Sequence, residues 1–295
     1  MKITVMGQGA WGQALAVVAR KAGHDIALWS RKSTQMQKCD AVIIAVPAQA
    51  LRHVLGAVNA PIIISAAKGI ERDTGLTMAE VVYAALPAHE FYALSGPSFA
   101  ADVLAGLPTA ITMAGRDLDT TAKLAAALSL PTFRIYASDD VIGVELGGAL
   151  KNVLAIACGV ADGRGLGQSA RASLITRGFA ELSRFAQLRG AKPETLMGLS
   201  GLGDLLLTCS STKSRNYSFG LALGKGQSAE TALAHSAGVV EGAATARIAA
   251  SLAEKHHVDM PIINAVNAII DGTLKPDDVI AKLLARPVGI ENKYR

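Results

Sequence analysis

The fold of this 295-residue chain depends on the stretch Ile3-Thr4-Val5-Met6-Gly7-Gln8-Gly9-Ala10-Trp11-Gly12. A short apolar run, residues 3–6, ends in a Gly-x-Gly-x-x-Gly motif, and residues 12–22 have the apolar spacing of a helix. In such a strand–turn–helix unit the first glycine permits the tight turn, the second lets the backbone approach a pyrophosphate, and the third lets the helix pack on the strand. The free N–H groups at the helix start attract an anion. The motif therefore predicts a dinucleotide-binding unit.

The alternation of apolar runs and helices continues through the first half, with further strand candidates at residues 26–29, 41–46, 62–65, 91–94 and 110–113. Continuous apolar runs separated by helices indicate a parallel sheet that is covered on both faces. From about residue 139 the periodicity is helical, with candidates at residues 141–160, 170–188, 241–255, 260–270 and 276–284. We therefore predict an α/β protein in which an N-terminal Rossmann-type doubly wound sheet, residues 1–138, precedes an all-helical C-terminal domain, residues 139–295.

The composition narrows the class of protein. The net charge of +5 comes from lysines and arginines that are spread along the chain, which favours a small anionic ligand over nucleic acid. Three distant cysteines are typical of reduced thiols rather than of disulfides or a zinc site. No run of eighteen apolar residues is present, and Gly7-Gln8-Gly9 interrupts the first apolar stretch, so we expect neither a membrane span nor a signal peptide but a cytoplasmic protein.

The type of nucleotide is indicated by the residues that follow the second strand candidate. An NAD-selective site places an acidic residue there, which binds the 2′-hydroxyl of the ribose. This chain has Trp29-Ser30-Arg31-Lys32 instead, with two cations and no acid. Because Arg31 would suit a 2′-phosphate, the sequence favours NADPH, with NADH possible. The alternative is an ordinary solvated arginine in a loop.

Lys151 is singled out by its surroundings. It lies within residues 144–156, which are apolar or small on nearly every helical face. Burial of an unpaired ammonium is costly and lowers its pKa, which suits a group that transfers protons. Gly147, one turn earlier, leaves room for a ligand. Lys151 is therefore a candidate proton donor and acceptor, and a structural lysine that reaches solvent is the alternative.

Two polar segments follow strand candidates. Lys68 comes after residues 62–65, and Gly96-Pro97-Ser98-Phe99-Ala100 comes after residues 91–94. Ligands of open α/β sheets bind at the carboxyl ends of the strands, and the second segment offers N–H groups and a hydroxyl to an anion. Taken alone, Lys68 would be an ordinary loop lysine.

A third candidate segment lies in the helical half. Asp204 ends an apolar, glycine-rich turn, residues 198–204, and a polar loop, residues 208–216, ends in Ser214-Arg215-Asn216. An arginine with neutral donors suits a phosphate, although a plain solvated loop is the alternative. The chain has no Gly-x-Ser-x-Gly motif, P-loop or His-Glu-x-x-His motif, so we expect neither that nucleophile nor a metal site.

Together these residues resemble the bacterial NAD(P)-dependent glycerol-3-phosphate dehydrogenases. The resemblance rests mainly on three specific runs, GVELGGALKNV at residues 143–153, ARASLITRG at residues 170–178 and GLSGLGDLLLTC at residues 198–209. Further matching segments, in the order of the family, are residues 7–12, 66–71, 94–100, 106–110 and 239–242. The matches span most of the chain.

The resemblance implies reversible reduction of dihydroxyacetone phosphate to sn-glycerol 3-phosphate with NADPH or NADH, which supplies phospholipid synthesis. It implies that Lys151 is the catalytic proton donor and acceptor, and that Asp204 orients Lys151 or holds the C1 hydroxyl. The implied substrate contacts are Lys68, Gly96, Ser98, Lys151, Asp204, Ser214, Arg215 and Asn216, of which the last three hold the phosphate. The implied cofactor contacts are Gly7, Gly9, Ala10, Trp11, Gly12, Arg31, Lys68, Ala100, Arg215, Val239 and Glu241.

The sequence departs from the family's pattern between Arg31 and Asp40, where it is clearly shorter and lacks a helix, a loop and a small strand. This puts the adenosine end of the cofactor site in doubt. Two other functions remain as alternatives. One is another β-hydroxyacid-type dehydrogenase, against which Asp204 and residues 214–216 argue. The other is a non-catalytic NADP sensor, against which the lysines argue. We expect a homodimer, because the alanine-rich helices are suited to packing against a second copy.

Overall fold

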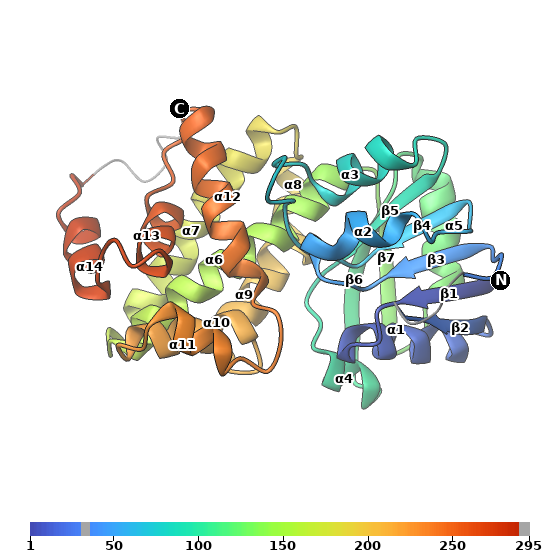
Figure 1. The fold of residues 1–295 in the computed structure, drawn as a ribbon, viewed down its shortest axis with the longest axis horizontal. Coiled ribbons are helices and arrows are strands. Elements are labelled where there is room, and N and C mark those ends of the chain that lie inside the picture. The colour runs from blue at the N-terminus through green and yellow to red at the C-terminus, as the bar shows by residue number, and fades with distance from the viewer. Residues whose placement is uncertain (31–35, 289–295) are drawn as a thin grey trace.

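The computed structural model describes residues 1–30 and 36–288, which form a sheet-containing N-terminal part and a helical C-terminal part (Figure 1). The sheet has seven strands in the order β2-β1-β3-β4-β5-β6-β7, so that β2 and β7 are its edges. Their bounds are β1 (Lys2–Met6), β2 (Asp25–Trp29), β3 (Ala41–Ile44), β4 (Ile62–Ser65), β5 (Glu90–Ser95), β6 (Thr109–Ala114) and β7 (Phe133–Ser138). The doubly wound α/β fold is thereby confirmed.

Two features of the sheet differ from the prediction. The strands β5 and β6 pair antiparallel, while every other pair is parallel, so the expected parallel arrangement is wrong at this pair. In addition, β7 had no counterpart among the strand candidates. Because β7 is an edge strand with a half-exposed face, it lacks the continuous apolar run of the central strands.

Helices cover both faces of the sheet, which explains why the central strands β3 and β4 are apolar at all positions but Ser65. Ile43 and Ile64 belong to the buried cluster beneath α1 (Ala10–Lys21) and α5 (Leu118–Leu128). Their neighbours Ile44 and Ile63 belong to the cluster on the other face. That face carries the 3-10 turn η1 (Ala48–Ala50), α2 (Leu51–Leu55) and α3 (Met78–Ala85), and the short helix α4 (Ala100–Leu104) follows β5. Successive side chains of a strand point to opposite faces, so both faces contribute to the core.

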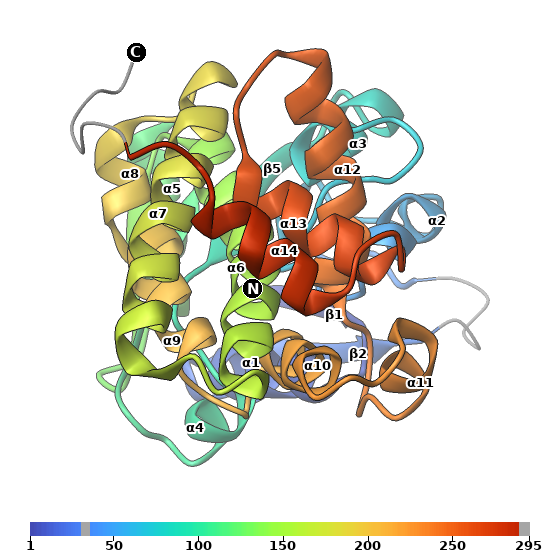
Figure 2. The ribbon, with the colours of Figure 1, turned by 90° about the vertical axis from the view of Figure 1, so that its left-hand side faces the viewer.

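The helical part is built around α6 (Val141–Gly163), whose residues 143–161 are all buried. Figure 2 views this part from the side opposite the sheet, with α6 surrounded by the other helices. These are α7 (Gly167–Leu188), α8 (Pro193–Met197), α9 (Asp204–Cys209), α10 (Arg215–Gly224), α11 (Ala229–Ala234), α12 (Glu241–Lys255), α13 (Pro261–Ile270) and α14 (Pro276–Leu284). By length and hydropathy alone α6 could span a membrane. However, 83% of its apolar 18-residue stretch is buried inside the protein, as in a core helix.

Glycines allow α6 and α10 to approach each other at the level of the backbone. A Cβ atom at Gly159 of α6 would lie 2.1 Å from the carbonyl oxygen of Tyr217, and one at Gly220 of α10 would lie 2.1 Å from that of Ile156. No other residue type fits at either position without separating the helices. The N-terminus of α10 is therefore held at a defined distance from α6.

Candidate active site

The Gly-x-Gly-x-x-Gly turn between β1 and α1 has the shape that the motif predicts. Gly7 has φ +109°, and a Cβ atom there would lie 2.5 Å from the carbonyl oxygen of Ala45. A Cβ atom at Gly12 would lie 1.9 Å from the carbonyl oxygen of Gly7. Gly9, by contrast, faces open space and is the N-cap of α1, so no side chain caps the helix. The turn thus leaves the first N–H groups of α1 free, and it fits the pyrophosphate of a dinucleotide.

The other predicted cofactor residues lie in several elements. Ala10 and Trp11 form the first turn of α1, and Ala100 begins α4. Val239 is exposed in the segment before α12. Glu241, the first residue of α12, accepts a hydrogen bond from the backbone N–H of Ala48 at 3.1 Å and so joins the helical part to the sheet-containing part. Burial raises the pKa of the Glu241 carboxyl. Arg31 lies outside the described residues.

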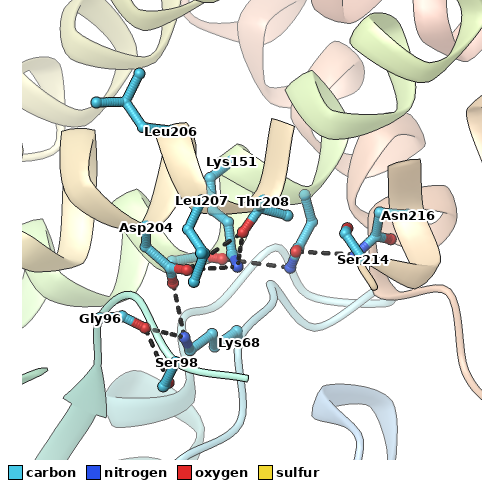
Figure 3. Close-up of polar contacts among 12 residues, drawn as sticks. Lys68, Gly96, Ser98, Lys151, Asp204, Leu206, Leu207, Thr208, Ser214 and Asn216 are labelled. Atoms are coloured by element: carbon cyan, nitrogen blue, oxygen red, sulfur yellow. Dashed lines mark hydrogen bonds and ion pairs between the residues drawn. The ribbon is translucent and has the colours of Figure 1, made fainter. Parts of the chain in front are cut away.

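Two predicted lysines meet at one buried carboxylate, as Figure 3 shows. The ammonium of Lys151 donates to Oδ1 of Asp204 at 2.9 Å and to Oγ1 of Thr208 at 2.7 Å. The ammonium of Lys68 donates to Oδ2 of Asp204 at 2.7 Å and to the carbonyl oxygen of Gly96 at 3.1 Å. Asp204 is 1% exposed and Lys151 is 7% exposed. The cluster joins the two parts of the molecule, because Lys68 follows β4 whereas Lys151 and Asp204 belong to α6 and α9.

The local fold around Asp204 differs from the expected glycine-rich turn. Residues Leu199–Gly203 form a π-helical turn, and Asp204 is the first residue of α9. Glycines let this turn lie against its neighbours, since a Cβ atom at Gly147 would be 2.8 Å from the carbonyl oxygen of Ser200. The room that Gly147 leaves is therefore filled by this turn. The turn places Asp204 and Thr208 one helical turn apart, both facing Lys151.

The electrostatics of the cluster lower the pKa of Lys151. Burial lowers the pKa of Lys151 to about 8; Asp204 opposes this shift and the positive charge of Lys68 adds to it. Burial alone would raise the pKa of Asp204, but the two lysines outweigh it and hold that pKa below its usual value. Two cations and one anion leave the cluster with an excess positive charge, which is suited to an oxygen atom that becomes negative.

The residues predicted to bind phosphate are near the N-terminus of a helix rather than in a plain loop. Ser214 caps α10 by accepting from the N–H of Tyr217 at 3.3 Å, and Arg215 and Asn216 form the first turn. The side chain of Arg215 is exposed, whereas Ser214 and Asn216 are buried. The N-terminus of a ten-residue helix, with an arginine beside it, is suited to an anion.

Gly96 and Ser98 belong to the sheet-containing part of the molecule, where they follow β5. Gly96 has φ +145°, and a Cβ atom there would lie 2.8 Å from Cα of Ile111, so only glycine fits. The hydroxyl of Ser98 donates to the carbonyl oxygen of Gly96 at 3.1 Å. That carbonyl also accepts from Lys68. Residues of both parts therefore surround the lysine cluster.

Two residues of the site were not among those predicted. Thr208 accepts from Lys151, and the side-chain oxygen of Asn152 accepts from Asn216 at 2.9 Å. Asn216 in turn accepts from the N–H of Gly242 at 2.9 Å, which links α10 to α12. The available signal for Asn152 was its position beside Lys151 in an otherwise apolar helix. Thr208 could have been found from its i, i+4 spacing to Asp204.

Comparisons with known proteins agree in family and in fold. The family profile described as NAD-dependent glycerol-3-phosphate dehydrogenase C-terminus matches residues 140–281, and the corresponding N-terminus profile matches residues 2–41 and 33–121. The chain is similar to the glycerol-3-phosphate dehydrogenase (NAD(P)+) of Brucella ovis, at 49% identity with 99% of both chains covered, and to that of Parvibaculum lavamentivorans, at 46% identity with 97% of both covered. It is also similar to the crystal structure of glycerol-3-phosphate dehydrogenase from Coxiella burnetii, with a TM-score of 0.89, 36% identity, and coverage of 97% of this chain and 99% of that one.

The same comparisons bear on the short connection between β2 and β3. The alignment with the Brucella ovis protein extends over 328 positions, whereas this chain has 295 residues, so the alignment opens gaps in this chain. The two segments of the N-terminal profile overlap at residues 33–41. The interruption of the profile match at these residues agrees with a connection that is shorter here than in the family profile.

Proposed function

The chain belongs to the family of NAD-dependent glycerol-3-phosphate dehydrogenases, and we propose that Lys151, Lys68 and Asp204 carry its reaction. It is an NAD(P)H-dependent enzyme that reversibly reduces dihydroxyacetone phosphate to sn-glycerol 3-phosphate. The observation that supports the proposed roles is the convergence of both lysines on Asp204, with Lys151 buried and its pKa lowered to about 8.

Lys151 is the proton donor for the C2 oxygen of the substrate. When bound, the reduced nicotinamide supplies the hydride for the carbonyl carbon. The carbonyl oxygen then gains an electron pair, and the ammonium of Lys151 gives it a proton, which leaves a neutral amine and an alcohol. In the direction of oxidation, the neutral amine takes that proton back. A pKa of about 8 lets Lys151 do both near neutral pH.

Lys68 and Asp204 prepare the site for this transfer. The positive charge of Lys68, beside Lys151, stabilises the developing negative charge on the oxygen. Asp204 holds both ammonium groups, one on each carboxylate oxygen, and so keeps two like charges close together in a buried site. Thr208 adds an acceptor that orients the Lys151 ammonium.

The substrate phosphate is placed at the start of α10. Ser214, Arg215 and Asn216 would bind it, and Gly96 and Ser98 would contact the substrate from the other part of the molecule. Binding of the phosphate would position the reacting carbon next to Lys151. The positions of Gly96, Ser98, Ser214 and Asn216 around the lysine cluster in Figure 3 support these roles.

Cofactor binding is assigned chiefly to residues 1–138 and the catalytic and substrate groups chiefly to residues 139–295. The glycine turn (Gly7, Gly9, Gly12), together with Ala10, Trp11, Lys68, Ala100, Arg215, Val239 and Glu241, would hold the cofactor. NADPH is the favoured cofactor because Arg31 would bind its 2′-phosphate. An Arg31→Ala variant should lower the ratio of kcat/KM for NADPH to that for NADH about tenfold or more, and an unchanged ratio would refute this role.

The experiment that tests the proposed function follows the absorbance of NADPH in the presence of dihydroxyacetone phosphate. The wild type should oxidise NADPH, while Lys151→Ala should bind NADPH normally, by fluorescence, and lose turnover by about a thousandfold. Binding without turnover in the folded wild type would favour a non-catalytic sensor. Turnover only with a non-phosphorylated β-hydroxyacid or its keto form would favour the other dehydrogenase class.

We also propose that the enzyme acts in the cytoplasm and as a homodimer. Three buried free cysteines are suited to a reducing compartment. A second copy could cover exposed apolar side chains of the helical part, among them Leu188, Met197 and Leu206. Light scattering should give twice the mass of the chain, and the mass of a single chain at micromolar concentration would exclude the dimer.

A further inference from the structure

Glu145 is a buried carboxylate that the reaction does not use. It lies on α6, is 7% exposed, and accepts a hydrogen bond at 2.9 Å from the backbone N–H of Ala79 in the first turn of α3. One side chain of the helical part thus holds the start of a helix of the other part. Burial of a carboxyl group costs free energy of folding unless hydrogen bonds compensate for the loss of water. The presence of Glu145 in this apolar helix therefore suggests that its hydrogen bond has a role.

The start of α3 is connected to Lys68 by a short path. Ile70, two residues after Lys68, pairs in an antiparallel bridge with Thr77, the N-cap of α3. Ile70 is fully buried and belongs to the cluster of the helical part that includes Leu146 of α6. The segment that carries Lys68 is therefore fastened to α6 through Ile70, Thr77 and the α3 turn that Glu145 holds.

The same face of α6 also touches Lys68 itself. A Cβ atom at Gly148, three residues after Glu145, would lie 2.5 Å from Oγ of Ser95 and 3.5 Å from the side-chain carbons of Lys68. Lys151 follows three residues later. One helix thus carries the group that holds the Lys68 segment, the surface on which Lys68 packs, and the second lysine of the pair.

We propose that Glu145 is a positioning residue that sets the distance between Lys68 and Lys151 by holding the start of α3 against α6. The inference rests on the roles proposed above for the two lysines. The neighbouring charged and titratable groups are Glu80 and Tyr83 of α3 and Arg189, which donates to Glu80 at 3.1 Å. None of these donates to Glu145 within the described residues. The Thr77 side chain and the backbone N–H groups of Met78 and Ala79 lower its pKa, so the groups that face it belong to the start of α3.

The test compares Glu145→Ala with Glu145→Gln, which retains an acceptor oxygen. The alanine variant should lose about tenfold or more in kcat, with an unchanged Kd for NADPH. Because the charge of Lys68 lowers the pKa of Lys151, a displaced Lys68 should also move the alkaline limb of the kcat/KM profile for reduction to higher pH. The glutamine variant should keep the wild-type limb and most of kcat. If the alanine variant does not fold, Glu145→Asp should show the same shift of the alkaline limb to higher pH, because the aspartate side chain is too short to reach the N–H of Ala79.

The chain offers a matched control in Glu181 of α7. It is also buried, and it accepts from the N–H groups of Ile262 and Ile263 at the start of α13, away from the lysines. Glu181→Ala should lose stability but keep the wild-type kcat and alkaline limb. The same limb shift in Glu181→Ala, or none in Glu145→Ala, would overturn the proposal. Retained turnover in Lys151→Ala would instead refute the proposed function.

Discussion

At the scale of single residues, the site depends on one carboxylate whose two oxygens each bind a different lysine. Asp204 gives Oδ1 to Lys151 and Oδ2 to Lys68, and it has almost no contact with solvent. The attraction of Asp204 keeps Lys151 charged despite burial, while Lys68 and burial together make its proton easier to remove. The balance of these three effects places the pKa of Lys151 near physiological pH, where it can act in both directions.

The first prediction concerns the pH dependence that follows from this balance. Reduction needs the protonated Lys151, so kcat/KM for reduction should be level below about pH 8 and fall above it. Oxidation needs the neutral amine, so kcat/KM for that direction should rise through about pH 8. The pH profiles of kcat/KM in the two directions should therefore have opposite slopes around pH 8.

An Asp204→Asn variant checks the cause of that behaviour. Loss of the carboxylate removes the interaction that raises the pKa of Lys151. The pH at which the rate of reduction falls, and that at which the rate of oxidation rises, should therefore both be lower. The buried Lys151 and the partly buried Lys68 would also lose their counter-charge, at a cost of about 3–5 kcal/mol in unfolding free energy. A limb that stays near pH 8 in this variant would assign the titration to another group.

At the scale of elements, the close contact of α6 and α10 predicts the effect of a single methyl group. Gly159→Ala would place a Cβ atom 2.1 Å from the carbonyl oxygen of Tyr217, so α10 must move. We expect a loss of about 1–3 kcal/mol in unfolding free energy and a higher KM for dihydroxyacetone phosphate, because α10 begins at Arg215. Urea unfolding and steady-state kinetics measure both.

The control for this change is a glycine in open space. Gly56 has φ −63°, and no atom lies within 4 Å of an added Cβ atom. Gly56→Ala should therefore be neutral or slightly stabilising. Equal stability of Gly159→Ala and the wild type would mean that the two helices are not in backbone contact.

Glu181, which holds the start of α13, predicts how stability varies with pH. Burial raises the pKa of its carboxyl to about 7 in the folded state, from an ordinary 4.5. A raised pKa stabilises the fold at low pH, and this contribution is lost as pH rises from about 4.5 through about 7. Compared with the wild type, Glu181→Gln should therefore gain relative stability between pH 5 and pH 8. Urea midpoints that differ by the same amount at both pH values would contradict this.

At the scale of the whole molecule, the sequence predicts the parts that have a strong local signal. The glycine turn could be identified from its motif, and Lys151 could be identified because burial of a lysine in an apolar helix costs free energy. The edge strand β7 could not, since Arg134 and Ser138 interrupt its apolar pattern. The antiparallel pairing of β5 and β6 depends on how the chain returns to the sheet, which periodicity does not encode.

The site shows the same limit for a different reason. Lys68, Lys151 and Asp204 were each predicted, but their mutual contacts join residues that are up to 136 positions apart in the chain. No local pattern states that one aspartate serves both lysines. Asn152 and Thr208 were missed because their importance appears only when α9 and α10 are packed on α6.

The charge of the whole chain predicts how salt acts on the enzyme. The chain carries a net charge of +5, and both the substrate and the cofactor are phosphate anions. Long-range attraction raises their rate of encounter and is screened beyond about 8–10 Å at physiological ionic strength. The contacts of Asp204 with Lys68 and Lys151 are buried and shorter than 3 Å, so salt should screen them little. Raising KCl from about 20 to about 300 mM should therefore lower kcat/KM for dihydroxyacetone phosphate several-fold while kcat changes little. A fall in kcat with unchanged kcat/KM would show that the lysine cluster, and not the surface, responds to salt.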